Sequence, residues 1–166
     1  MDRHPSLYER DILLWSEEQA DALRRLKAGR RDLPNDLDLD NIVEEIESVG
    51  RSELHAVESL LRQMLIHLVK AASAPGADAA AHWSGEIRAF QADAQARFTP
   101  SMARRIDLDR LWRTAVEIAA YGLRAHGQSP TALPEACPFP LESLLADDFT
   151  VEGALAALSG PASPEG

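Results

Sequence analysis

Residues 39–74 read LDNIVEEIESVGRSELHAVESLLRQMLIHLVKAASA, and this stretch decides the fold because it holds the longest run with one unbroken apolar period. Steps of three and four residues are the spacing of an amphipathic helix. The positions that follow this spacing are Leu39, Val43, Ile46, Gly50, Leu54, Val57, Leu61, Met64 and Leu68. The stretch contains no catalytic motif, so it predicts architecture rather than chemistry.

Gly50 allows two interpretations of this stretch. A glycine near a helix end often takes the left-handed conformation that terminates the helix, which would give two shorter helices here. The register argues against a break, because at about 100° per residue the apolar positions after Gly50 continue the face of those before it. We therefore predict one continuous helix, in which the missing side chain lets a neighbouring helix approach closely. The glycine costs about 1 kcal/mol relative to alanine.

Shorter helices are predicted on both sides of the long one. Ser6 and Glu9 have the spacing of a capping box, so they open a first helix that ends at Gly29. Asp38 is a natural N-cap for the long helix. Apolar residues at helical spacing predict two further helices, over about residues 79–98 and 108–126.

The chain changes character after residue 127, where four prolines between positions 130 and 140 favour an extended strap. Short helices are predicted within it, at 140–146 and 151–158. The sequence thus predicts an all-α fold, an antiparallel bundle of four main helices with one very long central helix and a Pro-rich C-terminal strap. Residues 1–158 are expected to form a single helical domain and residues 159–166 a flexible tail.

The composition restricts the cellular compartment and the classes of partner that we expect for this protein. Its net charge is −10, with 27 Asp and Glu against 17 Lys and Arg, which disfavours nucleic-acid binding. The single Cys137 permits no internal disulfide, and the opening MDRHPSLYERD is too charged for a signal peptide. The most apolar run, residues 60–74, is too short and too polar to span a bilayer. We expect an acidic cytoplasmic protein of bacterial type, without a membrane partner.

Carboxylates and histidines on the long helix are the candidates for chemistry, since both are metal ligands. Glu47, Glu58 and His67 are the candidate set for a metal-dependent, hydrolase-like enzyme. His55 and Glu45 lie on one outer side of the helix and His67 on the opposite flank, so a site would need His82, His126 or a second subunit. A solvated acidic face is the simpler interpretation. Phosphate-binding glycine loops, nucleophile elbows and H-E-x-x-H are absent from the sequence, and no cofactor is predicted.

Glu47 lies close to the apolar face of the long helix, beside Gly50. An acidic group in such a place is usually paired, and Arg51 stands at the i,i+4 spacing. We predict a structural ion pair between Glu47 and Arg51. A general acid or base at Glu47 would require a pKa shifted by burial.

Three motifs in order suggest a family. They are YERDILLWSEEQADALRRL from Tyr8, DNIVEEIESVGRSELHAVESLLRQMLIHLVK from Asp40 and CPFPLESLLADDF from Cys137. The chain resembles the bacterial family catalogued as domain of unknown function 29, whose members share a tyrosine-and-tryptophan opening helix and motifs like ENLxEEIESLGRSE and CPxxLExLLDEDF. The resemblance implies an all-helical protein and no particular activity.

Two functions remain open at this point. The first is a non-catalytic protein-interaction or regulatory module, which binds a protein partner or a second copy of itself. A helix of roughly 35 residues would run about 50 Å and extend beyond a small bundle, which favours self-association along a helix seam. The seam residues would be Gly50, Leu54, Val57 and Leu61. The alternative is the metal-dependent enzyme, and the chain is more readily explained as a non-enzyme.

Overall fold

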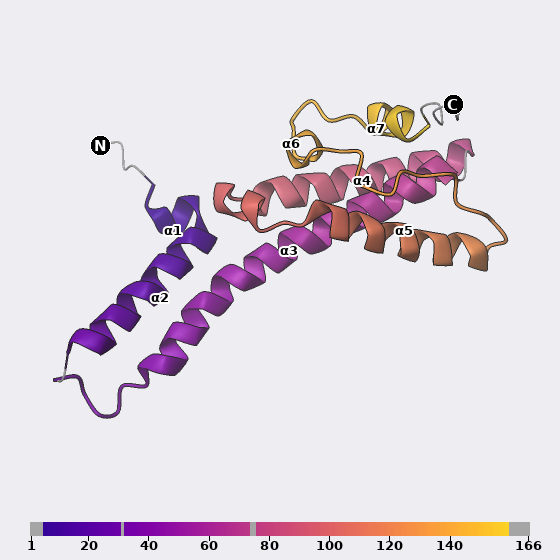
Figure 1. Ribbon diagram of the computed structural model, residues 1–166. Helices are drawn as coiled ribbons and strands as arrows, with labels where there is room; N and C mark the ends of the chain where they lie inside the picture. The colour runs from indigo at the N-terminus through magenta and orange to yellow at the C-terminus, as the bar shows by residue number, and fades with distance from the viewer. Residues whose placement is uncertain (1–4, 31, 74–75, 160–166) are drawn as a thin grey trace, which may run out of the picture. The chain divides into compact units, whose positions relative to one another are not determined.

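The described part of the chain is built from helices. The computed structural model describes residues 5–30, 32–73 and 76–159, and none of these residues lies in a strand (Figure 1). Of the predicted tail, only Ser159 falls among the described residues. The elements in order are α1 (Leu7–Arg10), α2 (Ile12–Gly29), α3 (Leu39–Ser73), α4 (Ala77–Arg97), the short 3₁₀ helix η1 (Pro100–Arg104), α5 (Leu108–Ala125), α6 (Leu141–Leu144) and α7 (Val151–Leu158). The predicted all-helical fold is confirmed.

Helix α3 is the very long central helix that the apolar period predicts. It runs unbroken for 35 residues and passes through Gly50 without a change of conformation. The continuity of the apolar register across Gly50 was therefore the correct guide to the backbone. The long helix and the short helices α6 and α7 of the C-terminal strap are confirmed.

The first helix differs from the prediction, because it is divided at Asp11. Ser6 and Glu9 do form the capping box, but α1 ends after one turn at Arg10. Asp11 has non-helical backbone angles, φ −153° and ψ 86°, and its carboxylate accepts a hydrogen bond from the amide of Leu14. It therefore acts as the N-cap of a separate helix, α2.

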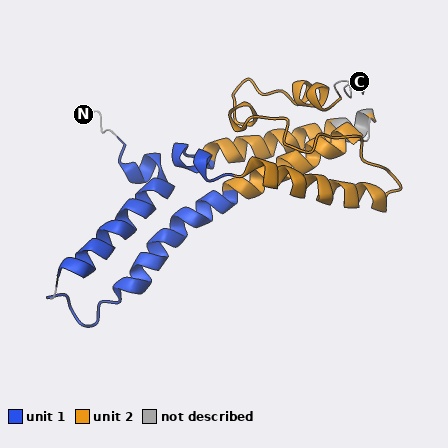
Figure 2. Ribbon diagram, viewed as in Figure 1, with its two compact units in different colours: residues 1–56, 97–106 blue, residues 57–96, 107–166 orange. Residues whose placement is uncertain are grey.

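The chain forms two compact units (Figure 2). Unit 1 comprises residues 1–56 and 97–106, and unit 2 comprises residues 57–96 and 107–166. Helix α3 contributes its amino-terminal half to unit 1 and its carboxyl-terminal half to unit 2. A single domain over residues 1–158 stays a prediction.

Unit 1 is a hairpin of α2 and the first half of α3. The two helices approach closely at Gly50, where an added Cβ atom would lie 2.1 Å from Ser16 Oγ and 3.2 Å from Leu13 Cα. Ser16 is fully buried there, and its hydroxyl donates to the carbonyl of Leu13 at 2.8 Å. The small residues Gly50 and Ser16 thus set the separation of the two helices.

A second fixed point in unit 1 is the buried carboxylate of Asp11, which is 7% exposed. Besides capping α2, it accepts hydrogen bonds from the hydroxyls of Thr99 (3.0 Å) and Ser101 (2.6 Å) and from the amide of Ser101 (3.0 Å). One side chain therefore ties the start of α2 to the segment that contains η1.

Unit 2 holds most of the apolar core. Its largest fully buried side chains come from the second half of α3, from α4, from α5 and from the strap. They are Leu61, Met64, Leu65, Leu68, Ile87, Trp112 and Leu144. Trp112 also donates its indole N–H to the carbonyl of Pro134 at 2.9 Å, which anchors the Pro-rich segment to α5. The predicted strap is thus held by a specific polar contact as well as by packing.

Amide side chains of α4 hold the later part of the strap by its backbone. The Nε2 group of Gln91, which is 1% exposed, donates to the carbonyls of Leu144 (3.1 Å) and Ala146 (2.9 Å). One turn further on, Gln95 donates to the carbonyl of Leu145 at 2.9 Å. A buried backbone carbonyl needs such a partner, because the strap has no regular ladder to supply one.

The substitution Gln91→Leu is expected to loosen the strap. It keeps the side-chain volume but leaves the carbonyl of Leu144 buried without this donor, at a cost of about 2 kcal/mol. Hydrogen exchange of the amides over residues 141–149 should accelerate. Gln95→Leu is the matched control, because Gln95 is only half-buried and water can replace its amide. Equal protection in both variants would contradict the role given to Gln91.

Candidate functional site

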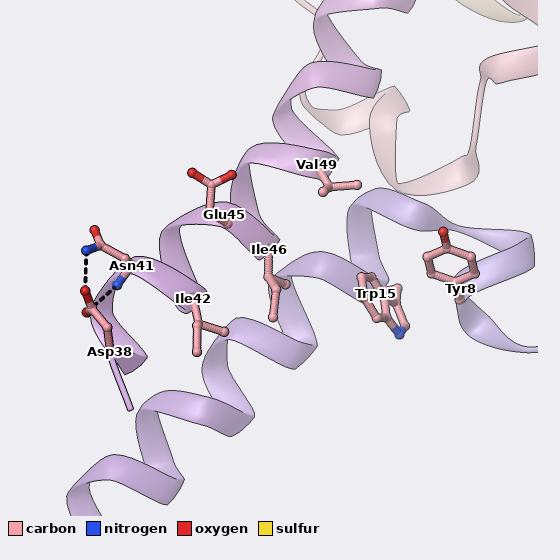
Figure 3. Close-up of a pocket in the computed structure, with 8 residues that line it drawn as sticks. All are labelled: Tyr8, Trp15, Asp38, Asn41, Ile42, Glu45, Ile46 and Val49. Carbon is pink, nitrogen blue, oxygen red and sulfur yellow. Dashed lines mark hydrogen bonds between the residues drawn. The ribbon is translucent and has the colours of Figure 1, made fainter. Parts of the chain in front are cut away.

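An open groove of about 500 Å³ lies on one side of unit 1. Tyr8 of α1 and Trp15 of α2 form one wall, and α3 forms the other (Figure 3). The second wall is lined by Asp38, which immediately precedes α3, and by five residues of α3, namely Asn41, Ile42, Glu45, Ile46 and Val49. These residues are spaced by three and four, so they share one face of α3. We call this site the α2–α3 groove.

Ile42 and Val49 of α3 form the apolar floor of the α2–α3 groove, and both are open to solvent, as is Tyr8 in the aromatic wall. Tyr8 is 56% exposed, Ile42 37% and Val49 43%. Five of the seven large hydrophobic side chains that the described residues expose lie in unit 1, and three of these five, Tyr8, Ile42 and Val49, line the groove. Exposed hydrophobic side chains that gather in one place, unlike scattered ones, are typical of a binding surface.

The aromatic wall has a defined geometry. Tyr8 and Trp15 pack edge to face, with ring centroids 4.9 Å apart and an interplanar angle of 80°. The capping box at Ser6 fixes the single turn of α1, which holds Tyr8 beside Trp15 across the break at Asp11. The division of the first helix therefore shapes this wall.

The α3 edge of the groove is acidic. The carboxylate of Asp38 accepts a 2.5 Å hydrogen bond from the side-chain amide of Asn41 and a longer one from its backbone N–H. These hydrogen bonds hold the pKa of Asp38 below its ordinary value, so the group is ionised at neutral pH. Glu45 is exposed, and its carboxylate forms no hydrogen bond or ion pair within the described residues.

The opposite flank of the hairpin is polar and paired. Measured around α3 from Gly50, Ile42 and Val49 lie about 80–100° to one side, whereas Asp40 and Glu44 lie about 80–120° to the other. Lys27 contacts Asp40 at 2.5 Å, and Arg51 contacts Glu44. The hairpin therefore has one apolar flank and one flank closed by ion pairs.

Glu47 lies on the paired flank with two cationic neighbours. Arg51, the partner predicted from the sequence, is 3.7 Å away, and Arg24 of α2 is closer, at 2.8 Å. The contact with Arg24 links the two helices. It was missed because only the pairing of α2 with α3 brings residues 24 and 47 together.

The candidate metal ligands have separate partners. Glu47 belongs to unit 1, whereas Glu58 and His67 belong to unit 2. Glu58 accepts from Arg110 at 3.1 Å, and His67 Nε2 lies 2.7 Å from a carboxylate oxygen of Glu86. Among the described residues, no three His, Cys, Asp or Glu side chains gather in a way that could hold a metal ion.

The predicted seam residues lie mostly inside the chain's own packing. Gly50 faces α2, and Val57 and Leu61 have no exposed surface. Leu54 is half-buried. Ile42 and Val49, which are exposed beside this seam, were not singled out in the sequence. Ile42 and Val49 are seven residues apart and lie next to the main apolar face, and this spacing was the one sign in the sequence that they form a second apolar strip.

Comparisons with known proteins agree with this all-helical architecture. The family model described as "Domain of unknown function DUF29" matches residues 7–150. A solved structure, that of an alpha-helical protein of unknown function from Rhodospirillum rubrum, is 41% identical in sequence, with a TM-score of 0.87. The match covers 96% of this chain and all of that one. No curated protein matched. None of the described helices is long and apolar enough to cross a membrane.

Proposed function

The chain belongs to the family described as domain of unknown function DUF29, and we propose that it is a non-catalytic interaction module whose α2–α3 groove docks a segment of another polypeptide. One observation carries the proposal, namely that the exposed apolar side chains of Tyr8, Ile42 and Val49 line one groove of unit 1. A soluble monomer gains nothing from leaving Tyr8, Ile42 and Val49 in water, whereas a partner would remove them from it.

The groove has the features of a helix-binding site. Apolar residues of α3 stand at positions 42, 46 and 49, and an aromatic pair stands across from them. A helix docks in such a groove by presenting apolar side chains at matching intervals of three and four residues. The close packing of Gly50 against Leu13 and the buried Ser16 holds α2 and α3 together, so the groove does not depend on the partner for its shape. The proposed compartment is the cytoplasm, where a protein with a single cysteine needs no oxidising environment.

Photocrosslinking tests the proposal. We expect a photoreactive phenylalanine analogue in place of Val49 to form a covalent adduct with a polypeptide in the cells that produce the protein. The adduct should disappear when Ile42→Asn opens the apolar floor to water. Mass spectrometry of the adduct would show whether the partner is a second copy or another protein.

The matched control places the same analogue at Ile118, which is 45% exposed on α5 and lies outside the groove. If the protein is an interaction module, the analogue at position 49 should crosslink strongly to a partner, and the analogue at position 118 should crosslink only at background level. Equal labelling from both positions, or labelling from 49 that Ile42→Asn leaves unchanged, would contradict the proposed function.

A further inference from the structure

The charges around the α2–α3 groove are unbalanced. On the paired flank of α3, Asp40, Glu44 and Glu47 each contact a lysine or an arginine. On the groove side, Asp38 and Glu45 form no ion pair within the described residues, although the charge of Lys27, which contacts Asp40, also helps to lower the pKa of Asp38. Two carboxylates without an ion pair therefore stand at the edge of an apolar surface, and a ligand with positive charge would pair with them.

The α2 side of the groove does not supply that charge. Tyr8 and Trp15 are the residues of α1 and α2 that line the groove, and neither carries a charge. Glu18 and Arg25 line a separate hollow on α2. The lining of the groove thus carries two carboxylates, those of Asp38 and Glu45, and no cationic group.

This imbalance discriminates between the two kinds of occupant. A second copy would bring the same surface to itself, because a two-fold interface pairs one patch with its own copy. The carboxylates of Asp38 and Glu45 would then face the same two carboxylates of the other copy, with no cationic group in the lining of either groove, and like charges brought together oppose association. A partner of opposite charge meets no such repulsion.

We infer that the groove binds an amphipathic helix of another protein that carries lysine or arginine beside its apolar stripe. The inference rests on the proposed function of the groove and adds the chemistry of the partner. Apolar side chains of the helix fill the space between Trp15 and Ile46, and its cationic groups reach Asp38 and Glu45 at the α3 edge.

Calorimetric titration of the full chain with designed peptides tests the inference. The probe is a helical peptide of about 14 residues, with leucine at intervals of three and four and lysine elsewhere. A second peptide has glutamate in place of every lysine. The lysine peptide should bind at least about tenfold more tightly than the glutamate peptide.

Two double variants separate the charge from the apolar floor. Asp38→Asn with Glu45→Gln should weaken binding of the lysine peptide about tenfold, and asparagine still caps α3. The control for net charge is Glu117→Gln with Glu142→Gln, because both residues are exposed and distant in sequence from the groove. This control should change the affinity less than about twofold. Ile42→Asn with Val49→Asn should weaken binding of the lysine peptide about tenfold or more.

The outcomes distinguish the inference from the proposed function. If the control pair weakens the lysine peptide as much as the groove pair does, or if the glutamate peptide binds equally well, the basic partner is ruled out. The proposed function survives that result as long as Ile42→Asn with Val49→Asn still reduces binding. A dimer that this apolar variant dissolves would identify a second copy as the occupant instead. If the apolar variant changes neither peptide binding nor association state, both the inference and the proposed function fail.

Discussion

We expect the substitution Gly50→Leu to lower the free energy of unfolding by about 3 kcal/mol, through overpacking of unit 1. The first added atom already lies 2.1 Å from Ser16 Oγ, 3.1 Å from Leu13 Cδ1 and 3.2 Å from Leu13 Cα. The Ser16 hydroxyl can rotate away, but the Leu13 backbone can give way only if α2 moves as a whole. Leucine adds three further carbon atoms to that contact.

Urea unfolding and amide hydrogen exchange in α2 would measure this effect. Gly50→Ala should lower the free energy of unfolding by less than Gly50→Leu does. Adding Ser16→Ala to Gly50→Ala should restore part of the lost stability, because the side chains at positions 16 and 50 compete for one space. Gly85 provides the control, since it also lies inside a helix but has no neighbouring atom within 4 Å of an added Cβ. Gly85→Ala should raise stability by about 1 kcal/mol from helix propensity. Unchanged exchange in α2 after Gly50→Leu would refute the close approach of the helices.

The second large effect is expected for Asp11→Ala, which should cost about 3 kcal/mol. The substitution removes the N-cap of α2 and leaves the hydroxyl donors of Thr99 and Ser101, together with a backbone amide, without their acceptor. Asp107→Ala is the matched control, because Asp107 caps α5 in the same way, through the amide of Arg110, but is exposed. It should cost about 1 kcal/mol.

The contribution of Asp11 should also depend on pH. Burial alone would raise the pKa of Asp11, but hydrogen bonds from Ser101, Leu14 and Thr99 outweigh burial and hold it below the ordinary value. A lowered carboxylate pKa stabilises the folded state fully above the unfolded pKa of about 3.9, and this stabilisation is lost as the pH falls through the folded pKa. Below about pH 4, stability should fall more steeply in the wild-type protein than in Asp11→Asn. Parallel pH profiles would show that Asp11 is not the group responsible.

The sequence carried enough information to predict α3, and its length was read from local pattern alone. Apolar residues kept one phase on both sides of Gly50, so no break was needed. The break at Asp11 could not be read in the same way. It depends on Thr99 and Ser101, which follow 88 and 90 residues later in the chain. Contacts of that range have no periodicity in the sequence.

The candidate site was only partly visible in the sequence. Tyr8 and Trp15 both belong to the first of the three sequence motifs, but helical spacing could not show that Tyr8 stays exposed. Ile42 and Val49 lie at the edge of the main apolar face of α3, and spacing by three and four residues does not tell whether residues at this edge are buried or exposed. Whether this edge is covered depends on the neighbouring helix, and α2 covers only the side that Gly50 and Ser16 bring close.

Unit 1 is discontinuous in the chain, and this restricts how the protein can evolve. Residues 97–106 complete the unit that residues 1–56 begin, and Asp11 binds across that interval. A gene fragment that ends anywhere between residues 57 and 96 would encode the groove without the partners of Asp11. We therefore expect recombination to transmit the two units together, so that the groove is not found as a portable cassette fused to unrelated proteins.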